Sequence, residues 1–221
     1  MTVAAYDAYA DWYEAFATDT SNDYMTQVRS RLRDLLGAGS GRCLDLCCGT
    51  GLQAAELRAL GWHPVGVDLS AGQLRHARPR LPVARGDAAA LPVADASVPA
   101  VACVLAHTDV PDYPAVIAEA ARVLAPGGRF VHVGVHPCFT GAFADRSDRE
   151  RIVIDGGYAK RERSFRAWSP HGVRVRVGAW HVPLADLLNA VTDAGLTLVR
   201  TAEAGLGPVP DLFAFLAIRP A

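Results

Sequence analysis

Apolar residues gather in short uninterrupted runs, and segments with helical spacing separate one run from the next. The runs fall at 43–46, 64–68, 83–85, 98–106 and 129–135. The run over 98–106 is almost wholly apolar, which is typical of a central parallel strand buried on both faces. Helices are predicted between the runs, over 52–60, 70–77 and 114–124, with Ser70 as the cap of the second. Strands that alternate with helices predict a doubly wound, mostly parallel α/β sheet.

The first part of the chain is predicted to be helical. A helix over 24–36 is expected to pack on the sheet and to end at Gly37. Before it, an aromatic stripe occupies one side of a helix over 6–16, formed by Tyr6, Tyr9, Ala10, Tyr13 and Phe16. Such a stripe is usually core packing, and we favour that interpretation.

The alternating pattern stops after residue 135. A charge-mixed segment over 136–181 predicts an insertion, with short strand candidates at 151–154 and 173–177 that suit an exposed hairpin or lid. A helix is then predicted over 183–194, ended by Gly195, and strands over 196–201 and 212–218. The turn-rich stretch between these two strands predicts an antiparallel hairpin at one edge of a seven-stranded sheet.

A glycine turn follows the first strand and carries the clearest chemical signal. Gly49 and Gly51 permit positive φ and leave the main chain bare, so a nucleotide-like ligand can lie against it. Asp68 ends the second strand, where an acid is well placed to accept from two ribose hydroxyls. Asp45 lies inside the first strand and would repel a pyrophosphate but attract an ammonium group. The third glycine of a dinucleotide fingerprint is also missing, because Ala54 stands there.

Asp45, Gly49, Gly51 and Asp68 together resemble the first two motifs of the class I S-adenosylmethionine-dependent methyltransferases. Cys47 stands where that pattern has its first glycine, and we expect the small side chain to be tolerated beside the methionine end of the pocket. The resemblance implies S-adenosylmethionine as the cofactor. It extends the binding site to a further set of residues, which are Tyr13, Leu69, Asp87, Ala88 and Ala106.

Other stretches carry the same resemblance from about residue 6 to residue 135. Asp87 and Ala88 match the position that faces the adenine in that family, although Asp87 could instead serve only the turn. The stretch 91–97 is similar to the loop before the family's fourth strand, and the stretch 124–129 is similar to the turn before its fifth strand. Tyr13 lies in a segment similar to the family's lid element, which is the alternative to core packing. We therefore expect a single domain over 1–221, with a helical lid at 1–36 and a substrate-side insertion at 136–181.

Two histidines follow the fourth and fifth strands, where cofactor and acceptor would meet. His107 and His136 are candidate catalytic bases for an acceptor that must lose a proton, or they could be structural hydrogen-bond partners. Asp109 and Asp112 could orient either imidazole, but solvated loop acids are the more ordinary interpretation. His171 and His181 are expected to be surface or packing residues, with lining of the acceptor pocket as the alternative; no metal-ligand spacing is present.

Composition excludes several other classes of protein. The chain has 221 residues, of which 51% are hydrophobic and 20% charged, and its net charge of −1 offers nucleic acid no basic footprint. Five cysteines without CxxC spacing favour reduced core thiols over disulfides or a metal site. The sequence has neither a signal-peptide pattern nor an apolar run of membrane-spanning length, so we expect a cytoplasmic monomer or homodimer without a membrane partner.

The sequence therefore predicts methyl transfer from S-adenosylmethionine to an oxygen, nitrogen or carbon of a small-molecule acceptor. The closest resemblance is to the methyltransferases of quinone and secondary-metabolite biosynthesis. The stretch 106–111 lacks the motif associated with adenine or glutamine methylation, which disfavours those acceptors. Two alternatives remain open, namely an NAD-dependent oxidoreductase and a non-catalytic S-adenosylmethionine-binding protein.

Overall fold

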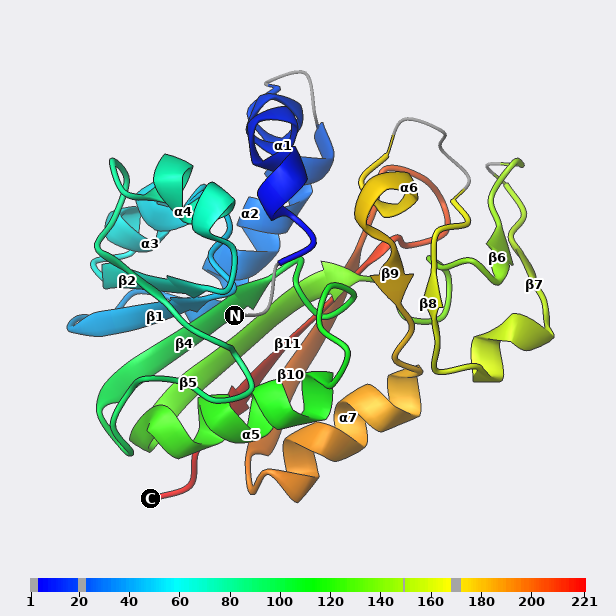
Figure 1. The fold of residues 1–221 in the computed structure, drawn as a ribbon. Coiled ribbons are helices and arrows are strands. Elements are labelled where there is room, and N and C mark those ends of the chain that lie inside the picture. Colours follow the sequence, from blue (N-terminus) through cyan, green and yellow to red (C-terminus); the bar gives the residue numbers. More distant parts are fainter. Residues whose placement is uncertain (1–3, 20–22, 149, 168–171) are drawn as a thin grey trace.

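A seven-stranded sheet forms the centre of the computed structural model, which describes residues 4–19, 23–148, 150–167 and 172–221. Its strand order is β10-β11-β5-β4-β1-β2-β3 (Figure 1). The strands are β1 (Arg42–Leu46), β2 (His63–Asp68), β3 (Val83–Arg85), β4 (Val98–Val104), β5 (Leu124–Val135), β10 (Thr197–Ala204) and β11 (Leu212–Ile218). β1 to β5 pair in parallel, and β11 pairs antiparallel with both β5 and β10. The predicted doubly wound sheet with an antiparallel C-terminal hairpin is confirmed.

Helices cover both faces of the sheet. They are α2 (Asp23–Leu36), α3 (Ala54–Ala59), α4 (Ala71–Ala77), α5 (Tyr113–Val123) and α7 (Leu184–Asp193). Successive residues of β4 point to opposite faces, so Val101 and Cys103 pack with α5 and α7 while Ala100 and Ala102 pack with α2. This two-sided burial explains the unbroken apolar run of β4 and leaves the strand ends to form a site.

The N-terminal segment lies above the strand ends and does not belong to the core (Figure 1). It consists of the short 3-10 helix η1 (Asp7–Tyr9) and of α1 (Ala10–Ala17). Ala10 and Ala17 are buried, but Tyr9 and Phe16 are 37% and 40% exposed. The prediction that the whole aromatic stripe packs in the core is therefore wrong.

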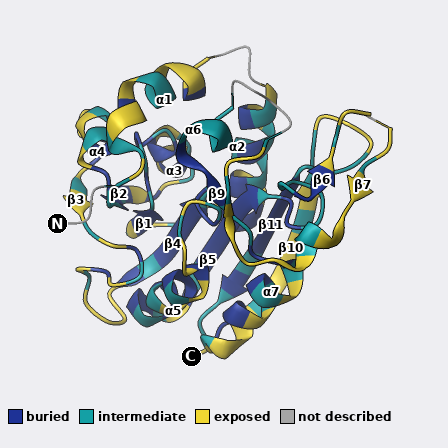
Figure 2. Ribbon diagram, turned by 45° about the vertical axis from the view of Figure 1, so that its right-hand side comes forward, coloured by how far each residue is buried: buried dark blue, intermediate teal, exposed yellow. Residues whose placement is uncertain are grey.

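The insertion forms two small antiparallel pairs beside the sheet (Figure 2). Its elements are β6 (Ala144–Asp145), β7 (Val153–Ile154), the 3-10 helix η2 (Gly156–Ala159), β8 (Arg163–Ser164), α6 (Arg174–Val177) and β9 (Ala179–Trp180). The strand candidate at 151–154 is confirmed at β7, whereas the candidate at 173–177 is wrong because this stretch forms α6. Five residues of Val/Arg alternation are too few to specify a strand when neighbouring elements favour a helical turn. His171 lies outside the described residues.

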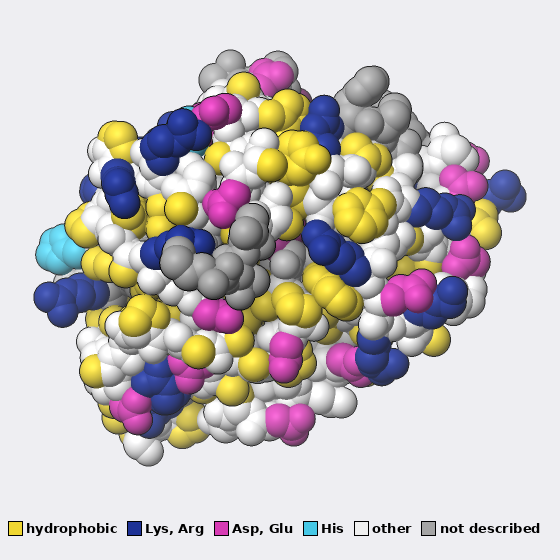
Figure 3. All heavy atoms as spheres, viewed as in Figure 1, with side chains coloured by type: hydrophobic (Ala, Val, Ile, Leu, Met, Phe, Trp, Pro, Cys, Tyr) yellow, Lys and Arg dark blue, Asp and Glu magenta, His cyan; other side chains and the backbone are white. Residues whose placement is uncertain are grey.

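Charges of both signs are interspersed on the face shown in Figure 3, with hydrophobic side chains between them. Among the described helices, none combines the length and the apolar character needed to cross a bilayer.

Candidate active site

A cavity of about 840 Å³ lies at the carboxyl ends of the parallel strands. Residues at or just beyond the ends of β1, β2, β3 and β4 line it, together with the N-terminal segment and part of the insertion. Ligands of open parallel sheets bind at this edge, so the cavity is the candidate site. Of the cofactor residues expected from the sequence, only Gly51 does not line the cavity. The residues that do are Tyr13, Asp45, Cys47, Gly49, Asp68, Leu69, Asp87, Ala88 and Ala106.

The glycine turn has the backbone shape that the sequence predicts. Gly49 and Gly51 have φ angles of +53° and +77°, a region that glycine enters without cost. A Cβ atom on Gly51 would lie 2.5 Å from Cδ2 of Leu81, so Gly51 shapes the turn from behind the cavity wall. Asp68 accepts hydrogen bonds from the amides of Gly49 and Ser70, both at 2.8 Å, which ties the turn to the end of β2.

Cys47 adopts a left-handed backbone conformation that favours glycine. Its φ angle is +56°, which is unfavourable for a residue with a Cβ atom. Its thiol is hydrogen bonded to Cys103 of β4, and this contact together with burial raises the pKa of Cys47. The side chain is therefore held against β4 at the wall of the cavity, and the five cysteines are all free thiols.

Buried oxygen atoms without partners identify the end of the cavity that can hold an amino group. Within the described part of the chain, Asp45 Oδ2, Gln53 Oε1 and Gln73 Oε1 have no hydrogen-bond partner, and all three residues line the cavity. Burial, and secondarily the charge of Asp68, raise the pKa of Asp45 to about 7. A cationic ligand group would donate hydrogen bonds to the unpartnered oxygen atoms and would stabilise the ionised form of the buried Asp45 carboxyl group.

Another part of the cavity wall is formed by the turn after β3. The Asp87 carboxylate accepts from the amide of Ala89 at 2.9 Å, so Asp87 shapes the turn and also lines the cavity with Ala88. The two interpretations of Asp87 are thus compatible. Leu69 lines the neighbouring wall, and its carbonyl accepts from Nε of Arg85 at 2.9 Å.

Acidic side chains attach the N-terminal segment above the glycine turn. Asp7 accepts from the Ser70 hydroxyl at 2.6 Å and from the Gly72 amide at 3.0 Å, and these bonds lower the pKa of Asp7. Glu14 accepts from Arg80, which also donates to the carbonyl of Thr50 at 2.7 Å. The sequence does not predict these attachments, because acids opposite an aromatic stripe resemble an ordinary solvated helix face.

The described side chains that line the cavity next to the insertion are mainly aromatic and basic. Met25, Phe165 and Trp180 line this side, and Arg163 and Arg176 lie among them. Arg176 also stacks over the ring of Trp12, with its Cζ 3.9 Å from the ring centroid, and so connects α6 to α1.

The structure places His107 and His136, the two candidate catalytic bases, away from the cavity. Neither is among the residues that line the cavity, and they are only 1% and 2% exposed. Burial lowers the pKa of His107 to about 3, and its ring packs edge-on against Tyr113 and His132. His136 accepts from the amide of Cys138 at Nδ1 and bonds Glu203 Oε1 through Nε2 at 2.8 Å. This burial favours the structural alternative for both imidazoles.

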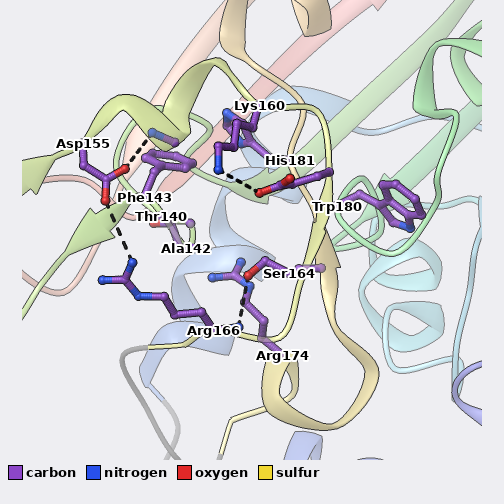
Figure 4. A pocket seen from close by; sticks show the side chains of 14 residues that line it. Thr140, Ala142, Phe143, Asp155, Lys160, Ser164, Arg166, Arg174, Trp180 and His181 are labelled. Carbon is purple, nitrogen blue, oxygen red and sulfur yellow. Dashed lines mark hydrogen bonds and ion pairs between the residues drawn. The ribbon is translucent and has the colours of Figure 1, made fainter.

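A second cavity of about 210 Å³ lies within the insertion (Figure 4). Its charges are largely paired, with Lys160 3.5 Å from Glu162 and Arg166 4.0 Å from Asp155. His181 lines this cavity and not the larger one, so the described geometry favours a packing role for it. No group of His, Cys, Asp and Glu suited to a metal ion occurs among the described residues.

Comparisons with known proteins agree with this geometry. Residues 43–128 match the family described as "Methyltransferase domain". A demethylmenaquinone methyltransferase of Mycobacterium sp. (strain KMS) is 40% identical over 128 residues, which is 57% of this chain and 56% of the relative. Another demethylmenaquinone methyltransferase, from Corynebacterium kroppenstedtii, is 30% identical over 185 residues, covering 78% of this chain and 81% of the relative.

The fold is also that of solved methyltransferases. A structure described as an S-adenosylmethionine-dependent methyltransferase from Mesorhizobium loti has a TM-score of 0.69 and 23% identity, covering 88% of this chain and 96% of that one. The chain belongs to the class I S-adenosylmethionine-dependent methyltransferases. It matches just over half the length of the mycobacterial relative.

Proposed function

We propose that this protein transfers a methyl group from S-adenosylmethionine to a small-molecule acceptor with a hydroxylated conjugated ring. The observation that carries the proposal is the cavity at the strand ends, with Asp68 at one wall and unpartnered oxygen atoms at another. The relatives named as demethylmenaquinone methyltransferases support a quinol-type ring.

The residues present fit the cofactor. Asp68 would hold the ribose hydroxyls, because each of its carboxylate oxygens has a free lone pair after bonding one backbone amide. Asp87 and Ala88 would lie at the adenine. Asp45, Gln53 and Gln73 would accept hydrogen bonds from the amino group of the methionine part, which supplies their missing partners.

The cofactor supplies a methyl group already activated on a positively charged sulfur, so this chain has mainly to position the acceptor. Tyr13 covers the cavity from α1, and Phe165 and Trp180 offer flat apolar surfaces on the acceptor side. The N-terminal segment, attached through Asp7 and Glu14, excludes water from above. We further propose that it acts as a lid and that the insertion over 136–181 forms the acceptor wall.

The oxidoreductase alternative fits the cavity less well. Five carboxylates line it, those of Asp45, Asp68, Asp87, Asp109 and Asp112, and they would repel the pyrophosphate of a dinucleotide. The binding-protein alternative predicts the same cofactor site but no product.

The test is incubation of the protein with S-adenosylmethionine and a panel of hydroxylated rings, among them naphthohydroquinones and catechols. Mass spectrometry should detect addition of one methyl group, together with release of S-adenosylhomocysteine. The Asp68→Ala variant should form no product, whereas Asp34→Ala, which removes an exposed acid on α2, should behave as wild type. If the adenosyl ligands bind but no acceptor is methylated, the binding-protein alternative is favoured.

A further inference from the structure

Two acidic side chains of the cavity, Asp109 and Asp112, have no role in holding the cofactor, and Asp112 is already occupied by the amide of Ala115. Asp109 lies in the loop between β4 and α5, and its amide donates to the carbonyl of Ala106 at 2.9 Å in a tight turn. Its side chain is exposed to the cavity. Asp109 therefore lies at the end of the central strand, on a loop beneath the N-terminal segment (Figure 1).

A tyrosine of the N-terminal segment orients this carboxyl group. The Tyr6 hydroxyl is hydrogen bonded to Asp109, and Tyr6 also lines the cavity. The ring of Tyr6 packs edge-on against Tyr13, with centroids 5.3 Å apart. One carboxylate oxygen of Asp109 can thus be held by Tyr6 while the other remains available to a ligand.

The charges around Asp109 oppose one another. Desolvation raises the pKa of the Asp109 carboxyl group to about 7, with a smaller contribution from the charge of Asp68. The Tyr6 hydrogen bond and the charges of Arg174 on α6 and Arg163 on β8 act in the opposite direction. Tyr13 of α1 also faces this charge. A carboxyl group that titrates near neutral pH can both accept and release a proton under ordinary conditions.

We propose that Asp109 is the base that accepts the proton of an acidic hydroxyl on the acceptor, and that Tyr6 is its positioning residue. The proposal rests on the proposed function and names the acceptor class more closely, as a phenol, quinol or enol. It also assigns the role for which His107 and His136 are too deeply buried.

The step balances without any further reagent. The hydroxyl proton moves to the carboxylate of Asp109, and the electron pair left on oxygen forms the new bond to the methyl carbon, either directly or through a conjugated ring carbon. The methyl–sulfur bond breaks with its electron pair on sulfur, which becomes a neutral thioether. In the ring-carbon case, the displaced ring proton leaves to water as the ring regains aromaticity.

Binding of a matched pair of probes tests the proposal without turnover. The probes are 1-naphthol, which has a hydroxyl proton to donate, and 1-methoxynaphthalene, which has none. Each is titrated into the complex with S-adenosylhomocysteine. With a pKa of about 7 for Asp109, the ionised fraction, and with it the affinity for 1-naphthol, should rise about tenfold from about pH 6 to about pH 8. The methyl ether should bind equally at both values.

Three variants assign the effect to named groups. Asp109→Asn should weaken 1-naphthol binding about tenfold at about pH 8 and abolish its pH dependence. Tyr6→Phe should move the midpoint of the pH dependence to higher pH. In the wild-type protein the hydrogen bond from Tyr6 lowers the pKa of Asp109, so its loss raises that pKa. Asp112→Asn changes an acid of the same loop whose carboxylate accepts from the Ala115 amide at 3.1 Å, and asparagine caps a helix equally well. This control should keep the wild-type pH dependence.

The outcomes separate this proposal from the proposed function. If S-adenosylhomocysteine fails to bind the wild-type protein, the proposed function itself is overturned. If it binds wild type and Asp109→Asn alike, three results overturn the role of Asp109 alone. In the first, 1-naphthol does not bind. In the second, the methyl ether shows the same pH dependence as 1-naphthol. In the third, Asp109→Asn binds 1-naphthol with the same pH dependence as wild type.

Discussion

The carboxylate of Asp68 and the amide of Gly49 are joined by a hydrogen bond of 2.8 Å that links the end of β2 to the glycine turn after β1. The other carboxylate oxygen accepts from the Ser70 amide, also at 2.8 Å. The acid expected to hold the ribose therefore also fixes the turn against which the ligand lies. Binding and preorganisation depend on one side chain, so tests of the site must report on both.

The glycine turn tolerates no side chain at Gly51. We expect Gly51→Ala to lose about 1 kcal/mol from its positive φ and about 1–3 kcal/mol more from overpacking, because the new Cβ would lie 2.5 Å from Leu81. Gly127→Ala is the matched control, since Gly127 has a φ of +74° and nothing within 4 Å of the added atom. Urea denaturation measures both, and equal losses would show that the contact with Leu81 does not constrain the turn.

At position 47, glycine should give a more stable protein than alanine, which is the reverse of the usual order. At a φ of +56°, we expect Cys47→Gly to be more stable than Cys47→Ala by about 1 kcal/mol. Both variants lose the thiol contact with Cys103, so their difference isolates the backbone effect. Thermal unfolding of the two variants provides the comparison, and a more stable alanine variant would contradict the left-handed conformation.

The buried acid Asp45 should make stability fall as the pH rises. Its pKa is raised from 3.8 to about 7, so the folded state binds more protons than the unfolded state between these values. Burial of the Asp45 carboxyl group therefore lowers the stability of the folded state progressively up to about pH 7, and the loss is complete above that pH. We expect Asp45→Asn to gain about 1.4 kcal/mol per pH unit over wild type between about pH 5 and pH 7. Urea denaturation across this range tests the gain, which the exposed control Asp34→Asn should not show.

His107 should act on stability in the opposite direction. Its pKa is lowered to about 3, so the unfolded state binds a proton that the folded state does not once the pH falls below the ordinary histidine range. Wild type should lose stability on acidification between about pH 6 and pH 4, and His107→Gln should flatten this slope by up to about 1.4 kcal/mol per pH unit. The exposed His63→Gln variant serves as the control. An unchanged slope in His107→Gln would mean that the imidazole is accessible to protons in the folded protein.

The sheet and the cofactor side of the cavity could be predicted from the sequence because their signals are local. Unbroken apolar runs specify buried parallel strands, and Gly49, Gly51 and Asp68 act at the positions where the chain leaves those strands. The position of Tyr13 at the cavity agrees with the lid alternative and not with the core packing that we favoured for its stripe. By contrast, the stretch 173–177 alternates over only five residues, and its helical form depends on its surroundings.

The direction of side chains at the ends of strands could not be predicted. Leu105 has a φ of +57°, a turn that no glycine announces, and His107 beyond it packs back against Tyr113 and His132. The turn leaves Asp109, an unremarkable loop acid in the sequence, at the cavity wall. The charge environment of Asp109 comes from Tyr6, Arg163 and Arg174, which are distant in the chain and approach only in the folded protein.

The most direct test of the central claim is calorimetric titration of the protein with S-adenosylhomocysteine and with NAD. We expect S-adenosylhomocysteine to bind and NAD not to bind. Asp68→Ala should weaken the adenosyl ligand about 10- to 100-fold, since hydrogen bonds to a charged group are lost, while Asp34→Ala should not. Urea denaturation of Asp68→Ala separates lost contacts from a collapsed turn. Binding of NAD without S-adenosylhomocysteine, or undiminished affinity in a folded Asp68→Ala variant, would contradict the account.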